Sequence, residues 1–295
     1  KAKDGTVHVH VGTQTTGQGH DTAFSQIVAH HLSLPPERVR MLQGDTAVIA
    51  TGTGTGGSSS IPAGGNSVAM AAAKLADQLK DVASHALEAD ARDLEFADGS
   101  IRVAGTDRAV TLVDLASHPK ANADALRAAD AFVPKASTFP NGTHIVEVEI
   151  DEQTGQVAIV NYVIVDDFGY SLNPLLLEGQ VHGGTVQGIG QALLEDTVYD
   201  AGSGQLLTAS LMDYALPRAD DAPPFVFETR NVPCLSNPLG VKGAGEAGAI
   251  GSCPAIMNAV IDALWRAYEI SHIDMPATPQ RVWVAIEDAR RRTQD

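Results

Sequence analysis

Three glycine-rich segments divide this sequence, and each stands just before a stretch that we expect to be helical. The segments are residues 16–22, 51–65 and 237–251. Loops of this kind present many backbone amides and hydroxyls, which suit a phosphate group or a polar heterocycle. The first amides of a following helix add to this preference for anions. The fold must therefore hold three ligand-ready loops on a scaffold of strands and helices.

The segments between these loops predict an α+β fold with two subdomains. Residues 6–11 alternate apolar and polar side chains, whereas residues 66–89 run without glycine or proline. We expect strands at 6–11, 39–42 and 225–229, hairpins at 96–103 and 144–165, helices at 21–34, 66–89 and 173–194, and two further helices beginning at Pro254 and at Thr278-Pro279. Residues 116–136 are polar with little periodicity, so we place the boundary there, between subdomains 1–136 and 137–295.

The acidic composition argues against a nucleic-acid partner. The formal net charge is −16 at pH 7, and the one dense basic cluster, Arg290–Arg292, fits the solvated end of a terminal helix. No apolar run approaches the roughly 20 residues that span a bilayer, so we expect no membrane segment. The N-terminus lacks both an initiator Met and the apolar stretch of a signal peptide. We therefore expect a cytoplasmic chain that is part of something larger.

Two cysteines limit the redox centres that this chain can hold. Cys234 and Cys253 cannot bind an iron–sulfur cluster, which needs four thiolates, so any such cluster must lie on another chain. Without an export signal, we expect both thiols to be reduced and buried. His8 and His10 share one face of the first strand, but no third ligand is near in sequence. We interpret this pair as solvent-facing rather than as a metal site.

Residues 52–57 match the Gly-x-Gly-x-x-Gly spacing of a dinucleotide-binding turn, but the surrounding sequence differs. That turn needs a strand leading into it and a helix that begins immediately afterwards. Here the preceding strand is short, and three serines, Ile61-Pro62 and two more glycines follow before any helix. NAD binding at these residues, and with it an NAD-dependent oxidoreductase, is therefore a disfavoured alternative. A plain surface loop without a ligand is another alternative for this segment.

Two side chains in the glycine loops can carry chemistry. Gln18 supplies a hydrogen-bond donor and an acceptor together, as recognition of a pterin or a base edge requires. Glu246 is the one acid of the third loop, among glycines and apolar residues. Such a carboxylate should be partly desolvated, which favours a general base. The alternative is an ordinary exposed loop acid.

The loops and the segments between them together resemble the molybdopterin-binding large subunit of the xanthine oxidase family. The resemblance is greatest to its carbon-monoxide-dehydrogenase-like and aldehyde-oxidase-like members. The matching motifs are Gly17-Gln-Gly-His-Asp-Thr22, Gly44-Asp-Thr46, Gly56-Gly-Ser58, Val165-Asp-Asp-Phe-Gly169, Asn173-Pro174, Glu178-Gly-Gln-Val-His-Gly-Gly184, Gln187-Gly-Ile-Gly-Gln191, Met212-Asp-Tyr214 and Lys242-Gly-Ala-Gly-Glu-Ala-Gly248. Each motif alone is weak evidence, but their shared order over nearly the whole chain is specific.

The resemblance implies a role for each loop. Molybdenum would be held by the dithiolene of the pterin, with no protein side chain as a ligand. Glu246 would be the catalytic base while an electron-poor carbon is hydroxylated with oxygen from water. The cofactor would be the cytosine dinucleotide form of molybdopterin. The residues that would contact it are Gln18, Gly19, Thr22, Gly57, Ser58, Ser59, Ser60, Lys242, Gly243, Ala244 and Gly245.

The resemblance also implies partner chains. The N-terminal half of the family's subunit, which supplies other pterin contacts and much of the substrate pocket, has no counterpart in this sequence. An iron–sulfur subunit and a flavin subunit with FAD would carry the electrons away. The family commonly has Arg between the serines of its second loop, where this chain has Ser59, so that contact is not carried over. The substrate stays open among aldehydes, N-heterocycles such as purines, and CO, and a non-catalytic scaffold relative is the alternative.

Overall fold

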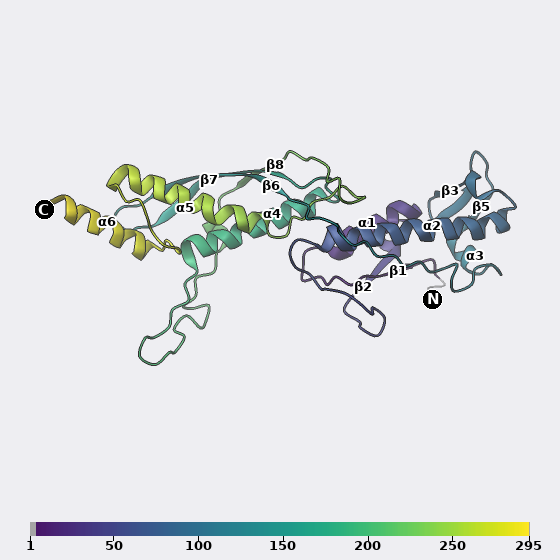
Figure 1. Cartoon of the computed structure of the whole chain (residues 1–295), viewed down its shortest axis with the longest axis horizontal. Coiled ribbons are helices and arrows are strands. Elements are labelled where there is room, and N and C mark those ends of the chain that lie inside the picture. The colour runs from purple at the N-terminus through teal and green to yellow at the C-terminus, as the bar shows by residue number, and fades with distance from the viewer. Residues whose placement is uncertain (1–3, 295) are drawn as a thin grey trace. The chain divides into compact units, whose positions relative to one another are not determined.

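The computed structural model describes residues 4–294 (Figure 1). Lys1 to Lys3, part of the expected cut end, and Asp295 lie outside the described residues. The chain forms two compact units. Unit 1 comprises residues 1–139, 170–173 and 233–243, and unit 2 comprises residues 140–169, 174–232 and 244–295. Each unit combines helices with a sheet, which confirms the predicted α+β class.

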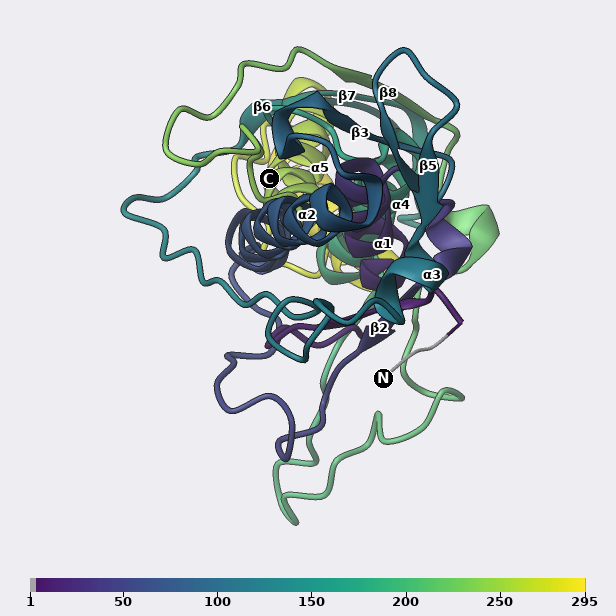
Figure 2. The same ribbon diagram turned by 90° about the vertical axis from the view of Figure 1, so that its right-hand side faces the viewer.

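Unit 1 is built around two helices that lie side by side, seen nearly end-on in Figure 2. Its elements are β1 (Val7–His10), α1 (His20–Leu32), β2 (Val39–Leu42), α2 (Asn66–Leu87), β3 (Leu94–Ala97), β4 (Ser100–Val103), β5 (Ala109–Thr111) and α3 (Leu112–Ala116). β1 and β2 are parallel, and β3, β4 and β5 form an antiparallel sheet. The core between these elements includes the fully buried Phe24, Leu32, Ile101 and Leu115.

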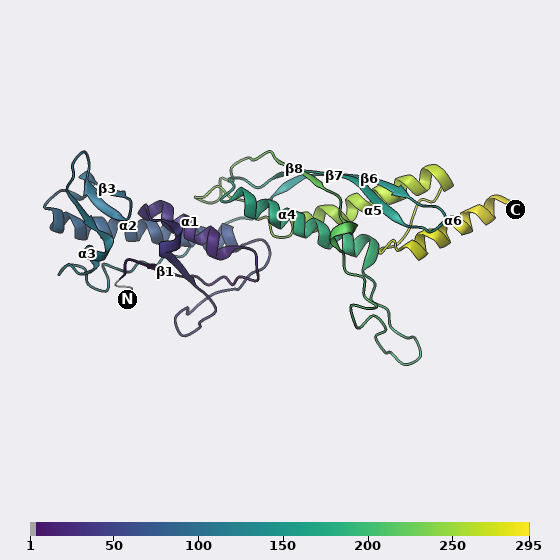
Figure 3. The ribbon, with the colours of Figure 1, turned by 180° about the vertical axis from the view of Figure 1, so that it is seen from behind.

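Unit 2 is a three-stranded sheet with helices on one face (Figures 1 and 3). Its elements are β6 (Asn141–Ile150), β7 (Val157–Asp167), α4 (Pro174–Ile189), β8 (Phe225–Thr229), α5 (Ala247–Tyr268) and α6 (Pro279–Gln294). β7 is central, antiparallel to β6 and parallel to β8. Ile164 of β7, Val181 of α4 and Ile256 of α5 are fully buried in the core that these elements share.

The predicted start of the helix at Pro254 is wrong. α5 begins at Ala247, and Pro254 lies inside it. The glycine-rich sequence before Pro254 suggested a loop. These glycines are instead part of the helix, because α5 packs so closely on its neighbours here that only glycine fits. A Cβ at Gly248 would lie 2.3 Å from Val181 O, and one at Gly251 would lie 2.6 Å from the ring of His144.

α5 is the helix that bears on the expectation of no membrane segment. Within residues 4–294 it is the one helix that is long and apolar enough to cross a membrane by length and composition. The core helix of a soluble protein has the same properties. α5 packs against α4, where Ile256, Val260 and Leu264 lie in the core of unit 2. Ile250 and Trp265 of the same helix are exposed, so packing within unit 2 covers only part of its apolar surface.

Two further sequence-based predictions concern His8 and His10 and the two cysteines, and the first is confirmed while the second is partly wrong. His8 and His10 are exposed, whereas Val7 and Val9 are half-buried, as predicted. Cys234 and Cys253 are free thiols, but each is half-buried rather than buried. Cys234 lies in a loop, and Cys253 lies on the flank of α5, with its Sγ 3.7 Å from Gly188 O.

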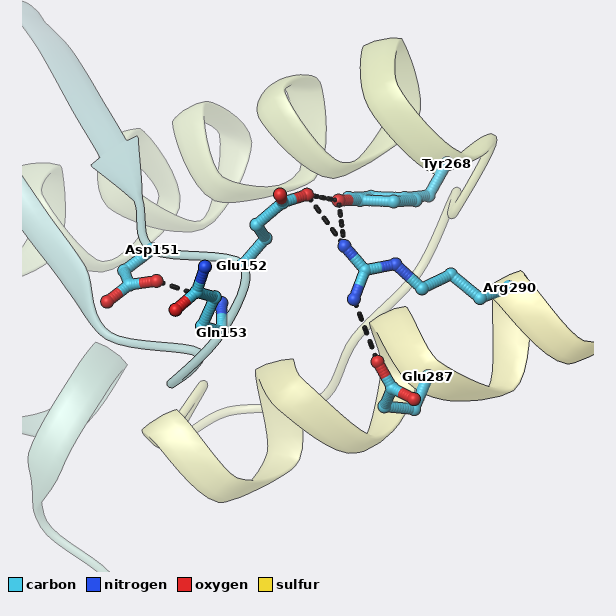
Figure 4. Close-up of polar contacts among 6 residues, drawn as sticks. All are labelled: Asp151, Glu152, Gln153, Tyr268, Glu287 and Arg290. Atoms are coloured by element: carbon cyan, nitrogen blue, oxygen red, sulfur yellow. Dashed lines mark hydrogen bonds and ion pairs between the residues drawn. The ribbon is translucent and has the colours of Figure 1, made fainter.

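A polar network fastens the C-terminal helix to the turn between β6 and β7 (Figure 4). Glu152 of the turn accepts hydrogen bonds from the hydroxyl of Tyr268 and, at 2.7 Å, from the guanidinium of Arg290. Arg290 also pairs with Glu287 at 2.8 Å. The hydrogen bond with Glu152 raises the pKa of Tyr268. Arg290, in the basic end of α6, therefore pairs with acidic residues of the same unit.

Candidate cofactor and catalytic sites

The first glycine loop places Gln18 between two segments of unit 1. Gly17 and Gly19 adopt φ values of 116° and 79°, a left-handed backbone that favours glycine. Gln18 Oε1 accepts a hydrogen bond from Thr16 N at 2.5 Å, and its Nε2 donates to Thr55 Oγ1 at 3.3 Å. The side chain is half-buried. Gln18 therefore ties the first glycine loop to the second.

Gly19 directly precedes α1, and its carbonyl accepts the hydrogen bond of Ala23 N at 3.0 Å. Thr22 lies in the first turn of this helix, and it is exposed. The helix has no side-chain cap at its N-terminus. The predicted contacts Gln18, Gly19 and Thr22 thus gather at the amino end of α1, where the helix dipole favours a negative charge.

The second glycine loop carries backbone strain at Ser58. Gly57 and Ser58 have φ values of 58° and 53°, and Ser58 is a residue type that seldom adopts this conformation. Such strain often accompanies functional sites. Ser59 Oγ donates to Gly56 O at 2.7 Å, and Ser60 Oγ lies 3.1 Å from Thr55 Oγ1. The serines are therefore held in place by the loop itself.

The geometry of the second loop excludes a dinucleotide-binding turn at residues 52–57. The strand β2 ends at Leu42, well before Gly52, and a π-helical turn at Ser60–Gly65 separates the loop from α2. Gly52 instead packs on another loop, since a Cβ there would lie 2.3 Å from Gly12 O. A strand, glycine turn and helix in direct succession are absent at residues 42–66, so the Rossmann arrangement does not occur there.

The third glycine loop meets the second one inside unit 1. A Cβ at Gly243 would lie 2.1 Å from Ser58 O, so only glycine permits this approach. Gly243 N donates to Thr138 Oγ1 at 3.1 Å, and the neighbouring Lys242 is half-buried. Three of the predicted contacts, Ser58, Lys242 and Gly243, are thus brought together although they are remote in sequence.

Sequence reasoning missed the asparagines that hold this third loop. Asn66, at the start of α2, donates to Asn237 Oδ1 at 3.2 Å and accepts from Leu239 N at 3.0 Å. Asn237 donates to Val241 O at 2.9 Å. Both asparagines are buried. The sequence held no signal for these contacts, because the burial and pairing of the asparagines arise from packing between segments remote in sequence.

Glu246 lies in unit 2, with Ala244 and Gly245, immediately before α5. Its carbonyl accepts a hydrogen bond from Ile250 N at 3.0 Å. The expected partial desolvation is not found, because Glu246 is exposed in this chain. A carboxylate here is accessible to a small molecule.

The helix that follows Glu246 is fixed by backbone contacts with α4. A Cβ at Gly184 would lie 3.0 Å from Ala249 N, and one at Gly188 would lie 1.6 Å from Ser252 Oγ. Glycine at these positions lets the two helix backbones approach closely. The glycines that weaken α4 as an isolated helix therefore position α5, and with it Glu246.

The residues of unit 1 fit a polar cofactor with anionic groups. A Cβ at Gly17, Gly54, Gly56 or Gly57 would meet nothing within 4 Å, so the backbone beside Gln18 and Ser58 stands open. The donors around this space are neutral amides and hydroxyls, which suit phosphates and a heterocycle edge. In residues 4–294 no group of three or more His, Cys, Asp or Glu side chains gathers as a metal site.

The comparisons with known proteins show the family of the chain. Residues 2–223 match the family model of the molybdopterin cofactor-binding domain. The chain is 35% identical over 290 residues to the carbon monoxide dehydrogenase large chain of Hydrogenophaga pseudoflava. It is 36% identical over 291 residues to the 6-hydroxypseudooxynicotine dehydrogenase complex subunit gamma of Paenarthrobacter nicotinovorans. Each match covers 96% of this chain and 36% of the relative, so the chain spans about a third of their length.

Solved structures show the same fold. The reconstituted CO dehydrogenase from Oligotropha carboxidovorans matches with a TM-score of 0.84 and 33% identity over 97% of this chain and 36% of that one. Quinoline 2-oxidoreductase from Pseudomonas putida 86 matches with a TM-score of 0.82 and 34% identity, over 97% and 37%. The resemblance seen in the motifs is confirmed. The chain belongs to the molybdopterin cofactor-binding domain family, and its relatives include a carbon monoxide dehydrogenase large chain and a xanthine dehydrogenase molybdenum-binding subunit.

Proposed function

We propose that this chain is part of the large subunit of a molybdenum hydroxylase, in which the glycine loops hold the cofactor and Glu246 is the catalytic base. The observation that carries the proposal is the meeting of loops in unit 1. Gly243 lies against the backbone of Ser58, and Gln18 reaches the same loop through Thr55. The first two loops belong to the proposed subdomain 1–136, and the third belongs to 137–295.

The proposed cofactor contacts divide by chemistry. Gln18 offers an amide to the edge of the pterin or its nucleotide, and the strained Ser58 presents its backbone and hydroxyl to a phosphate. Gly19 and Gly57 allow backbone approach, and Lys242 supplies a positive charge next to this set. The remaining proposed contacts are Thr22, Ser59, Ser60, Gly243, Ala244 and Gly245. When bound, the cofactor supplies two-electron redox chemistry.

Glu246 carries the proton-transfer part of the proposal. An ionised glutamate accepts a proton, and its neighbours in the loop leave the carboxylate accessible. The contacts between α4 and α5 fix the backbone from which it projects. A base held at a fixed position next to a bound substrate lowers the activation free energy, because little entropy is lost in positioning it during the reaction.

The relatives' names indicate the substrate class. By their names, these relatives act on carbon monoxide, on a nicotine-derived compound and, in quinoline 2-oxidoreductase, on an N-heterocycle. We infer oxidative hydroxylation of an aldehyde, N-heterocycle or CO-like carbon with oxygen from water. The remainder of the large subunit would complete the site, and iron–sulfur and FAD-containing subunits would accept the electrons. The cytosine dinucleotide form of the cofactor and a cytoplasmic location belong to the same proposal.

Mass spectrometry of the native complex that contains this chain tests the proposal. We expect stoichiometric molybdenum, a cytidine nucleotide released from the pterin, and co-purifying chains with iron–sulfur clusters and FAD. A complex with no molybdenum and no pterin would overturn the proposed function. A complex with molybdopterin but no iron and no flavin would overturn the proposed electron route alone.

A further inference from the structure

Three polar side chains lie next to one another in the core of unit 2. They are His144 of β6 with Tyr162 and Asp166 of β7, here named the His144 cluster. The side chains of His144 and Asp166 are 6% and 5% exposed, and Tyr162 is fully buried. His144 Nδ1 lies 2.9 Å from the Tyr162 hydroxyl, and its Nε2 lies 3.8 Å from Asp166 Oδ2. Burial of such groups is costly, so a structural filler would more simply be apolar.

Tyr162 orients the ring of His144, and Asp166 lies on the other side of the ring. Burial raises the pKa of Tyr162 well above its ordinary value, and Cys253 and Asp166 add to the rise. The phenol therefore keeps its proton, and its hydroxyl shares a hydrogen bond with His144 Nδ1 at 2.9 Å. His144 Nε2 lies 3.8 Å from Asp166 Oδ2, which is beyond hydrogen-bond distance. One hydrogen bond and one acidic neighbour thus surround the imidazole.

α5 runs directly over this ring. A Cβ at Gly251 would lie 2.6 Å from both Cε1 and Nε2 of His144, so the helix backbone itself rests on the imidazole. The next residue, Ser252, is fully buried. Its side chain makes a hydrogen bond that lowers the pKa of Tyr162 and so partly offsets the effect of burial. The cluster and the start of α5 form one packed assembly.

Glu246 is about one helical turn from this contact. Its carbonyl accepts the hydrogen bond of Ile250 N at 3.0 Å, and Gly251 is the following residue. On its other side, α5 contacts α4, where a Cβ at Gly248 would lie 2.3 Å from Val181 O. The first turns of α5 are therefore held between α4 and the ring of His144.

We propose that His144 is a positioning residue for Glu246, with its ring held by the hydrogen bond with Tyr162 and by packing against Gly251. The inference rests on the proposed role of Glu246 as the base. The hydrogen bond with Tyr162 keeps the ring against Gly251, so the first turns of α5 keep one position and the side chain of Glu246 keeps one starting point. Catalytic groups need placement within roughly 0.5 Å, and a helix start packed on both sides favours such placement.

The test uses the complex that contains this chain, with three variants of the cluster and one control. His144→Leu removes both ring contacts, Tyr162→Phe removes one hydroxyl, and His144→Gln retains a group that can bond to Tyr162. The control is Val148→Ala, which removes apolar contacts from the same strand and core. Each protein is measured by peptide-level hydrogen exchange, by molybdenum content, and by the kcat and KM of dye reduction.

We expect His144→Leu and Tyr162→Phe to speed hydrogen exchange at residues 246–253 about tenfold and to lower kcat about 10- to 100-fold, with KM and molybdenum content unchanged. His144→Gln should recover part of the loss. Val148→Ala should change neither the exchange at 246–253 nor the kcat. Exchange at 246–253 that is equal in His144→Leu and in the control would overturn the positioning role.

Glu246→Gln, measured in parallel, separates the two proposals. If it abolishes turnover while His144→Leu leaves kcat unchanged, the positioning role is overturned and the base stands. If Glu246→Gln retains turnover, the role of Glu246 as base is overturned, and positioning for catalysis falls with it. A rise in exchange at 246–253 in that case would still show that His144 holds the start of α5.

Discussion

Gln18 joins two loops of unit 1 through one side-chain amide. Its oxygen accepts from Thr16 N, and its nitrogen donates to Thr55 Oγ1 and, at 3.4 Å, to Gln14 O. A cofactor that binds Gln18 must share or replace these bonds. The residue therefore contributes to binding by direct contact and by keeping the first two loops together.

Gln18→Ala should lower cofactor retention more than it lowers the stability of the fold. Each hydrogen bond lost to a buried ligand costs about 1–3 kcal/mol, whereas the loop already contains glycine on both sides of Gln18. Molybdenum and pterin per chain, measured after identical purification, check this. Gln14→Ala is the matched control, because Gln18 contacts only its backbone carbonyl. Unaltered pterin content in Gln18→Ala would count against the contact.

α4 and α5 show why glycines stand inside a helix. A Cβ at Gly248 would collide with Val181 O and Thr185 N at 2.3 and 2.7 Å, whereas one at Gly183 would meet nothing within 4 Å. Gly248→Ala should therefore destabilise unit 2 by about 1–3 kcal/mol through overpacking. Gly183→Ala should stabilise it by up to about 1 kcal/mol, because alanine favours the helix. Equal midpoints of thermal unfolding for the two variants would contradict this packing.

Elements with strong local signals were predictable from the sequence. The long helix expected at 66–89 is α2, at Asn66–Leu87, and the strand expected at 225–229 is β8. Local composition encodes these segments, since it needs no knowledge of the rest of the chain. The helix start at Pro254 was wrong because tertiary packing, not local preference, makes the preceding glycines helical.

The candidate site was predictable only in part for the same reason. Gln18, Ser58 and Glu246 stand in recognisable loops, so their residue types and spacing drew attention to them. The contact of Gly243 with Ser58 and the burial of His144 arise from packing between segments remote in sequence. Periodicity and composition carry no information on such contacts.

At the scale of the whole molecule, the chain spans about a third of the length of the relatives that it matches. A site shared with the remainder of a large subunit cannot be complete in this chain, so the polypeptide alone should bind little molybdenum and show no turnover. Expression of residues 1–295 alone, followed by metal analysis and a dye-reduction assay, checks this. Stoichiometric molybdenum with activity would contradict the proposed shared site.

The most direct test of the central claim is the turnover of Glu246→Gln in the native complex at matched molybdenum content. The assay is reduction of an artificial dye with aldehydes, N-heterocycles and CO as substrates. Glutamine keeps the size of glutamate but cannot accept the proton, so the predicted result is a loss of about 10²–10⁴-fold in kcat with molybdenum and pterin unchanged. A near-normal rate in Glu246→Gln would contradict the assignment of Glu246 as the base.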